Sequence, residues 1–208
     1  MEHQREPPID LTHADAWLEP WLPLVRERLR DEPTLFDVGC GDGRDSALLA
    51  QAGARIVGID RSAAAIDAAR ARVPSGEFHV QDVRAPFPLA AGQAGVVVAS
   101  LSLHYFGSDE TLSLVRRLCD ALRPGGVMLC RLNSTNDHHH GASGHPAIET
   151  DYYLVNGEPK RFFDAAGVAR LFAHGWRIVQ REERCIDRYA HPKWVWEVVA
   201  EKTEASAR

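Results

Sequence analysis

The sequence has no long hydrophobic run and no excess of basic charge. A membrane-spanning helix needs roughly 18 or more consecutive apolar residues, and this 208-residue chain contains no such run. Its formal net charge is -5, whereas surfaces that bind nucleic acid are normally basic. The first ten residues, MEHQREPPID, lack the apolar core of a signal peptide. We therefore expect a cytoplasmic protein with no membrane and no nucleic acid among its partners.

Cysteine is scarce, and its spacing does not suggest a disulfide framework or a metal site. The four cysteines are scattered and form no C-x-x-C pair: Cys40, Cys119, Cys130 and Cys185. Reduced thiols are the expectation in a cytoplasmic protein. The histidine run His138–His140 is the remaining metal-like feature. Adjacent loop side chains point in different directions, however, and no paired Cys or Glu accompanies them, so we expect a polar lid and no bound metal.

The chain does contain a strand, a glycine loop and a helix start in direct succession, over residues 35–50 (LFDVGCGDGRDSALLA). The apolar beginning predicts a buried strand. The first turn of the helix offers free backbone N–H groups to a ligand. Three glycines at alternate positions allow a tight turn and a close approach of the backbone to that ligand: Gly39, Gly41 and Gly43. This arrangement predicts a site for a nucleotide-like cofactor.

The spacing of the glycines bears on the type of cofactor. Dinucleotide sites use G-x-G-x-x-G, whereas this loop reads G-x-G-x-G and has Arg44 in the following position. Asp37 stands at the strand end, just before the first glycine. A carboxylate there would repel a pyrophosphate but would suit the ammonium group of an amino acid. S-adenosylmethionine carries that ammonium and no phosphate, so the loop favours it over NAD.

Two more strand ends carry carboxylates. The apolar stretch 54–62 (ARIVGIDRS) contains Asp60 near the twenty-residue offset at which an acidic side chain accepts the ribose hydroxyls, a feature that NAD enzymes share. The stretch 77–88 (EFHVQDVRAPFP) predicts a third strand followed by Asp82. Asp82 could accept a hydrogen bond from the adenine amine, or it could serve as a turn or cap residue.

Four motifs in this order resemble the class I S-adenosylmethionine-dependent methyltransferases: DVGCGDG at 37–43, Asp60, QDV at 81–83 and LRPGG at 122–126. The resemblance covers about residues 30–133, with family-like order to about residue 202. It implies an enzyme of the EC 2.1.1 class, S-adenosylmethionine as cofactor and a small-molecule acceptor. The cofactor-binding residues that it implies are Asp37, Gly39, Cys40, Gly41, Gly43, Asp60, Arg61, Asp82, Val83 and Ser100.

Strands alternate with helices at a spacing typical of a doubly wound parallel sheet. The resemblance implies an α/β, Rossmann-like, seven-stranded and mostly parallel sheet with an antiparallel edge hairpin at the C-terminus, from strands 176–186 and 193–202. We expect a single domain over residues 1–208. Within it, residues 1–30 would form an N-terminal helical lid, and residues 133–163 a substrate-side lid with a hairpin at Asn156-Gly157.

Local signals predict several element boundaries. Ser62 is a candidate N-cap for a helix over residues 63–73, and Ser108 or Asp109 for a helix that runs to residue 122. Gly125-Gly126 predicts a turn before a strand over 127–132. A last helix is expected over residues 164–174, stopped by Gly175.

The segment 100–106 (SLSLHYF) lies where the reacting centre is expected. It lacks the Asp/Asn-Pro-Pro-aromatic motif of nucleic-acid amino-methyltransferases, and the chain has no Pro-Cys nucleophile. His104 and Tyr105 are the candidate catalytic residues. His104 could act as general base, orient the acceptor or simply pack in the pocket wall. On the predicted hairpin, Lys160 and Arg161 could meet an anionic acceptor or could be ordinary surface charges.

The acceptor and the assembly stay open at this point. The short chain and the GDGRDSALLA motif are loosely similar to tellurite-resistance-type methyltransferases, which implies a soft acceptor such as a thiol, a selenol or a tellurite-derived oxyanion. A monomer or a homodimer is expected. Two other functions also stay open: an NAD-dependent oxidoreductase on a similar sheet, and a non-catalytic protein that binds S-adenosylmethionine.

Overall fold

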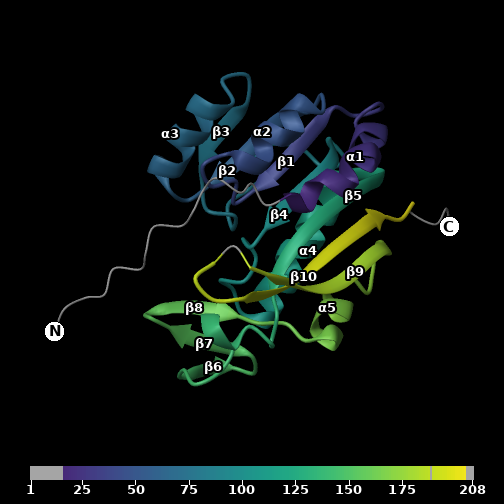
Figure 1. The fold of residues 1–208 in the computed structure, drawn as a ribbon. Helices are drawn as coiled ribbons and strands as arrows, with labels where there is room; N and C mark the ends of the chain where they lie inside the picture. The colour runs from purple at the N-terminus through teal and green to yellow at the C-terminus, as the bar shows by residue number, and fades with distance from the viewer. Residues whose placement is uncertain (1–15, 188, 205–208) are drawn as a thin grey trace.

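The centre of the protein is a seven-stranded sheet with the strand order β3-β2-β1-β4-β5-β10-β9 (Figure 1). The structure is a computed structural model that describes residues 16–187 and 189–204. β10 runs antiparallel to β5, and β9 runs antiparallel to β10, while the other neighbours are parallel. The strands are β1 (Thr34–Val38), β2 (Arg55–Asp60), β3 (Glu77–Val80), β4 (Ala94–Ser100), β5 (Leu122–Asn133), β9 (Trp176–Ile186) and β10 (Lys193–Lys202). The α/β fold and the C-terminal edge hairpin expected from the sequence are confirmed.

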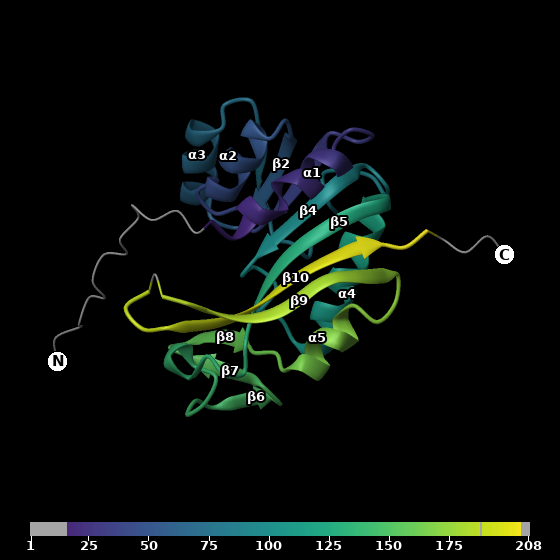
Figure 2. The ribbon, with the colours of Figure 1, turned by 45° about the vertical axis from the view of Figure 1, so that its right-hand side comes forward.

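Helices cover both faces of this sheet, as Figures 1 and 2 show. All five residues of β1 are buried, as expected for a parallel strand that is covered on both sides. Adjacent residues of β1 pack on opposite faces of the sheet. Leu35 packs in the hydrophobic cluster with α1, α2 and α3, and Phe36 packs in the cluster with α4 and α5. The helices are the 3₁₀ helix η1 (Ala16–Trp21), α1 (Leu22–Arg28), α2 (Arg44–Gln51), α3 (Ala63–Arg72), α4 (Ser108–Ala121) and α5 (Ala165–Leu171).

A second, three-stranded sheet lies below the end of β4 in Figure 1. It consists of β6 (Ala147–Glu149), β7 (Tyr152–Val155) and β8 (Glu158–Arg161), and it follows a short 3₁₀ turn, η2 (His138–His140). Asn156 and Gly157 link β7 to β8 with positive φ values of 53° and 85°. Two consecutive positive φ angles suit the tight hairpin turn that Asn-Gly favours, so the predicted hairpin is confirmed.

The small sheet is attached to the segment that follows β4. The backbone N–H of Arg161 donates to the carbonyl of His104 at 2.7 Å, and its Nε donates to the carbonyl of Phe106 at 2.9 Å. The hydroxyl of Tyr152 donates to the carbonyl of Tyr105 at 2.9 Å. These three bonds fix β7 and β8 over residues 104–106, next to the carboxyl ends of the parallel strands.

One of the two predicted N-caps is correct. Ser62 caps α3, because its Oγ accepts from the N–H of Ala65 at 3.2 Å. The prediction for α4 is wrong, since its N-cap is Gly107, which has no side chain to offer. The N–H of Ser108 instead donates to the carboxylate of Glu149 at 3.1 Å. A residue of the small sheet therefore supplies the cap that the local sequence lacks.

Two predicted boundaries also differ. β5 begins at Leu122, five residues earlier than the strand predicted after Gly125-Gly126, because Leu122 already pairs with Ala94 before the register shifts. The last helix is shorter than predicted: α5 begins after Asp164, whose carboxylate accepts from the N–H of Gly167, and it ends at Leu171.

The expected N-terminal lid lies partly outside the described residues, which begin at Ala16. The described part packs against the main sheet. Trp17 is 7% exposed and donates its Nε1–H to Asp45 at 3.2 Å, while the guanidinium of Arg131 lies 4.6 Å from the centre of its ring. Trp17 thus anchors the chain next to the start of α2. The lid and domain boundaries stay predictions.

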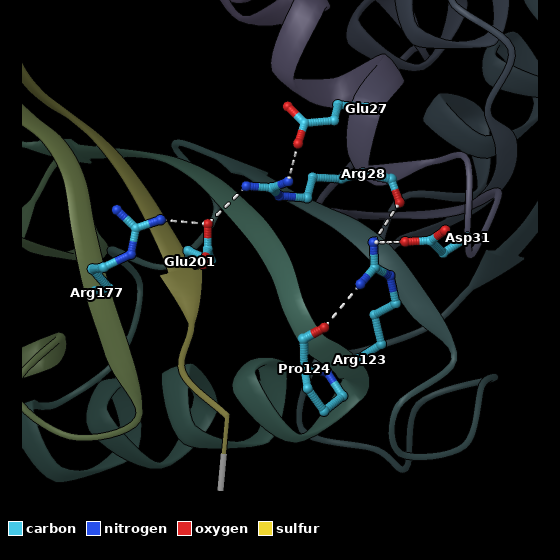
Figure 3. A network of polar contacts seen from close by, with 7 residues as sticks. All are labelled: Glu27, Arg28, Asp31, Arg123, Pro124, Arg177 and Glu201. Carbon is cyan, nitrogen blue, oxygen red and sulfur yellow. Dashed lines mark hydrogen bonds and ion pairs between the residues drawn. The ribbon is translucent and has the colours of Figure 1, made fainter. Parts of the chain in front are cut away.

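At the amino ends of the parallel strands, a network of ion pairs joins α1 to the C-terminal strands (Figure 3). Glu201 on β10 pairs with Arg28 at 2.9 Å and with Arg177 at 2.7 Å. Arg123 pairs with Asp31 at 3.1 Å and donates to the carbonyl of Arg28 at 3.0 Å. This network lies at the edge of the sheet opposite to the glycine loop. In the part of the chain that the structure describes, no helix is long and apolar enough to span a membrane.

Candidate functional site

A cavity of about 350 Å³ lies at the carboxyl ends of β1, β2 and β4 and is bordered by β8. Ligands of open α/β sheets bind at this edge. Six predicted site residues line the cavity: Gly39, Asp60, Arg61, Asp82, Val83 and Tyr105. Six others do not belong to its lining: Asp37, Cys40, Gly41, Gly43, Ser100 and His104. The sequence reasoning missed nine further lining residues: Val38, Ile59, Gln81, Arg84, Leu101, Ser102, Phe106, Glu158 and Pro159.

The glycine loop has the backbone geometry that its spacing predicts. Gly39, Gly41 and Gly43 have φ values of +70°, +54° and +77°, which side chains rarely tolerate. A Cβ at Gly39 would lie 2.4 Å from the Cβ of Ser102, so the loop packs directly on the segment after β4. A Cβ at Gly41 would meet nothing within 4 Å. The loop therefore leaves open space at its middle glycine, as a cofactor cradle requires.

Asp60 holds the glycine loop and also faces the cavity. Its Oδ2 accepts from the N–H of Gly41 at 3.0 Å, and its Oδ1 accepts from the N–H of Ser62 at 2.8 Å. Each carboxylate oxygen can accept a second hydrogen bond. Asp60 therefore has acceptor capacity for a pair of ribose hydroxyls, which is the role that the sequence predicts for it.

Asp82 has the turn role that the sequence left open, and it also lies where the adenine contact would require it. It lines the cavity. Its Oδ1 also accepts from the N–H of Arg84 at 2.8 Å, and its carbonyl accepts from the N–H of Ala85 at 3.0 Å, so it shapes the turn after β3. Val83 stands beside it in the lining and packs against the main core. The adenine contact predicted for this pair stays a prediction.

Asp37 lies beneath the loop. It is 2% exposed, and its Oδ2 accepts from the hydroxyl of Ser46 in α2 at 2.5 Å. Burial, with the nearby charges of Asp45 and Asp60, raises its pKa to about 7, although the bond from Ser46 opposes this shift. Asp37 thus links the strand end to the helix that follows the loop. Its direct contact with the ammonium of a cofactor stays a prediction.

His104 and Tyr105 stand side by side after β4, with ring centres 4.1 Å apart. Tyr105 lines the cavity, and the guanidinium of Arg61 lies 5.6 Å from the centre of its ring. His104 is 5% exposed. Burial, followed by the positive charges of Lys193 and Lys160, lowers its pKa to about 3. The imidazole is therefore neutral at pH 7, and its affinity for a proton is low.

Three buried polar atoms gather at this edge without a hydrogen-bond partner among the described residues: Ser102 Oγ, His104 Nδ1 and Asn133 Oδ1. Asn133 ends β5, and the other two follow β4. A buried polar group that makes no hydrogen bond costs about 1–3 kcal/mol, so such groups mark places where a ligand or water belongs. The site thus contains unused polar groups beside the cavity, as a binding site for a cofactor and an acceptor would.

The histidine run forms η2 and packs on the loop before β10. His140 Nδ1 lies 2.8 Å from Asp137 Oδ1, and the rings of His139 and His191 stack at 5.0 Å. No group of three or more metal-binding side chains occurs among residues 16–187 and 189–204. Cys40 is a buried free thiol whose pKa is raised by burial, so it is not a reactive thiolate.

Comparison with known proteins identifies a methyltransferase domain in this chain. Residues 35–126 match a family described as a methyltransferase domain. A trans-aconitate 2-methyltransferase of Paracidovorax citrulli is 36% identical over 131 residues, which are 54% of this chain and 50% of that protein. This domain agrees with the resemblance to the class I S-adenosylmethionine-dependent methyltransferases that the sequence motifs carry. These matches support the expected enzyme class, and the activity and its cofactor belong to the proposal below.

Two further matches extend over a larger part of this chain. A trans-aconitate 2-methyltransferase of Methylobacterium radiotolerans is 28% identical over 207 residues, which cover 84% of this chain and 78% of that protein. A methyltransferase structure from Methanosarcina mazei has a TM-score of 0.75 at 18% identity, covering 88% of this chain and 98% of that chain. The latter likeness concerns the fold alone. The chain spans about half the length of several curated relatives that it matches.

Proposed function

We propose that this methyltransferase transfers a methyl group from S-adenosylmethionine to a small-molecule acceptor that is already ionised when it binds. The observation that carries the proposal is the cavity at the carboxyl ends of β1, β2 and β4, with neutral His104 next to Tyr105, which lines it. The glycine loop would hold the methionine part, Asp60 the ribose, and Asp82 with Val83 the adenine. His104 and Tyr105 would face the acceptor.

The state of His104 supports an ionised acceptor. When bound, S-adenosylmethionine supplies a methyl group on a positively charged sulfur, and its transfer to a carboxylate breaks one C–S bond, forms one C–O bond and requires no proton transfer. An acceptor that arrives protonated needs a general base with a pKa near the working pH. His104, with a pKa of about 3, is poorly suited to that task. Its neutral ring can still orient an acceptor through a hydrogen bond.

A carboxylate is the acceptor that we favour. Several relatives are named trans-aconitate 2-methyltransferase, and trans-aconitate is a small carboxylic acid. A thiolate, a selenolate or a tellurite-derived oxyanion satisfies the same condition, because each is a soft anion that needs little help from a base. These are the second candidates. The net charge of -5 and the lack of a nucleic-acid methyltransferase motif in the sequence support a small molecule over a nucleic acid.

The test is methyl transfer by the purified protein to a panel of acceptors, followed by mass spectrometry of the product and of S-adenosylhomocysteine. The panel contains trans-aconitate, citrate, a small thiol, selenite, tellurite and a phenol. We expect a methyl ester from a carboxylic acid, with no product from the phenol. Binding of S-adenosylhomocysteine without turnover of any acceptor would favour the non-catalytic alternative.

Other expectations from the sequence belong to the same proposal. We propose a cytoplasmic enzyme that acts as a monomer or a homodimer, without a membrane or nucleic-acid partner. The NAD-dependent alternative loses its support, because the matching family is one of methyltransferases. The open backbone at Gly41 and the acceptor capacity of Asp60 suit either cofactor, so titration with NADH remains a useful control.

A further inference from the structure

Lysine is rare in this chain. Of the 24 lysine and arginine residues, three are lysines: Lys160, Lys193 and Lys202. Two of these come from different elements, β8 and β10, and the charges of both act on the buried ring of His104. The start of β10 runs beside β8 in Figures 1 and 2. Lys202 donates to the carbonyl of Leu122 instead, at the opposite edge of the main sheet.

Lys193 is held in place by a buried carboxylate. Its Nζ lies 3.0 Å from Oδ2 of Asp137, whose side chain is fully buried. Oδ1 of Asp137 accepts from the N–H of Trp194 at 3.1 Å and contacts Nδ1 of His140 at 2.8 Å. An ammonium group can donate three hydrogen bonds, and the bond to Asp137 uses one. This support orders Lys193 before a ligand arrives, which reduces the entropy lost on binding.

Lys160 lies on β8, next to a residue that lines the cavity. The residue before it, Pro159, lines the cavity, and the residue after it, Arg161, donates its backbone N–H to the carbonyl of His104 at 2.7 Å. β8 therefore brings Lys160 close to the segment of His104. Lys160 is partly buried, and it lies opposite Tyr153 in the hairpin.

The ring of His104 adds a third polar group to this region. Among the described residues, its Nδ1 has no hydrogen-bond partner although it is buried. The charges of two lysines, one on β8 and one on β10, act on this ring, which lies beside Tyr105, a residue that lines the cavity. A ligand that satisfies all three groups carries negative charge and forms hydrogen bonds.

We propose that Lys160 and Lys193 bind a carboxylate of the acceptor other than the one that receives the methyl group, so that the enzyme selects acceptors with two or more carboxylates. This inference rests on the proposed function. A cation in contact with the reacting oxygen would make it a weaker nucleophile, whereas a cation on a distant carboxylate orients the acceptor without that cost. Lysine binds as a compact point charge and does not demand the planar geometry that arginine does.

The test compares Lys160→Gln and Lys193→Gln with the matched control Lys202→Gln. Calorimetry with S-adenosylhomocysteine present measures the Kd of trans-aconitate and of its uncharged trimethyl ester. We expect the first two variants to weaken trans-aconitate binding about tenfold each, on the scale of one lost charged contact, and the control to change it less than about twofold. The Kd of S-adenosylhomocysteine should not change, and Lys160→Arg should recover part of the lost affinity.

A second measurement covers the case in which Lys193→Gln fails to fold because Asp137 loses its cation. Acetylation by acetic anhydride, followed by mass spectrometry, gives the reaction rates of Lys160 and Lys202 in the unaltered protein. Trans-aconitate should slow acetylation at Lys160 and leave Lys202 unchanged, and the trimethyl ester should slow neither. Equal rates at Lys160 with and without the acid would overturn the proposal.

The remaining outcomes separate this inference from the proposed function. If trans-aconitate, citrate and succinate all fail to bind the wild-type protein, the acidic subsite is wrong. If a methyl ester forms and the two lysine variants bind the acid as the wild type does, the subsite is also wrong while the function stands. If lysine-dependent binding occurs and no acceptor is methylated, the function fails and the subsite stands.

Discussion

The hydroxyl of Ser46 donates to the buried carboxylate of Asp37 at 2.5 Å and so joins the end of β1 to the helix after the glycine loop. The pKa of Asp37 is nevertheless raised to about 7, because burial outweighs this bond. A carboxyl group with a raised pKa binds its proton in the folded state at pH values where the unfolded chain has already released it. Stability therefore falls as the pH rises from about 4 to about 7.

Asp37→Asn should remove this loss of stability. Between about pH 4 and pH 7, deprotonation of Asp37 should lower the unfolding free energy of the wild type by up to about 4 kcal/mol. This amount is the free-energy equivalent of the shift in the pKa of Asp37. Below pH 4 the acid is protonated in both states, so the two proteins should then differ little in pH dependence. Urea unfolding at several pH values measures this. A wild type and a variant with parallel profiles from pH 4 to pH 8 would contradict the burial argument.

Asp60→Ala should weaken binding of S-adenosylhomocysteine by about 1–3 kcal/mol, the cost of a lost hydrogen-bond pair with a buried ligand. The variant also loses the bonds that Asp60 accepts from Gly41 and Ser62, so its folding is checked first. Asp67→Ala is the matched control, because Asp67 is an exposed residue of α3 that pairs with Arg70. Calorimetry that gives the same Kd for Asp60→Ala and the wild type would remove the ribose assignment.

His104→Ala should leave the affinity for S-adenosylhomocysteine nearly unchanged and lower kcat with the preferred acceptor. The ring is neutral from about pH 5 upward, since its pKa is lowered to about 3. We therefore expect the wild-type rate with a carboxylate acceptor to show no titration of His104 between pH 5 and pH 8. A loss of activity below a pKa near 6.5, absent in His104→Gln, would show that His104 titrates as an ordinary base.

Glu201→Ala should destabilise the fold without affecting the site. Glu201 pairs with Arg28 and Arg177 at the edge opposite to the cavity, and its side chain is 17% exposed (Figure 3). Removing it should lower the unfolding free energy by about 1 kcal/mol, which is the upper range for a partly exposed ion pair. Thermal unfolding gives the stability and calorimetry gives the affinity for S-adenosylhomocysteine. A weaker affinity in this variant would show that the two edges are coupled.

Features that depend on neighbouring residues were predictable from the sequence. The glycine loop, the cap at Ser62 and the turn at Asn156-Gly157 each follow from a few adjacent residues whose backbone preferences are strong. Both C-terminal strands have the predicted bounds; burial explains the apolar residues of β10, whereas most residues of the edge strand β9 are exposed. The alternation of strands and helices predicted a doubly wound parallel sheet, and the resemblance to the methyltransferases implied its seven strands and its antiparallel edge hairpin.

Features that depend on distant residues were not predictable. Glu149 caps a helix that begins 41 residues earlier, and the α4 sequence contains no sign of this. Glu158 and Pro159 line the cavity because β8 is bonded to residues 104–106, a contact that neither sequence segment encodes alone. The histidine run drew attention in the sequence, whereas in the structure the buried carboxylate of Asp137, one residue before the run, makes the contacts to His140 and Lys193.

The measurement that tests the central claim most directly is calorimetry of the purified protein with S-adenosylhomocysteine, with NADH titrated as the control. The account predicts micromolar binding of S-adenosylhomocysteine at one site per chain, lost or weakened in Asp60→Ala, and no binding of NADH. Binding of NADH alone, or of neither compound, would contradict the assignment of the cavity to S-adenosylmethionine.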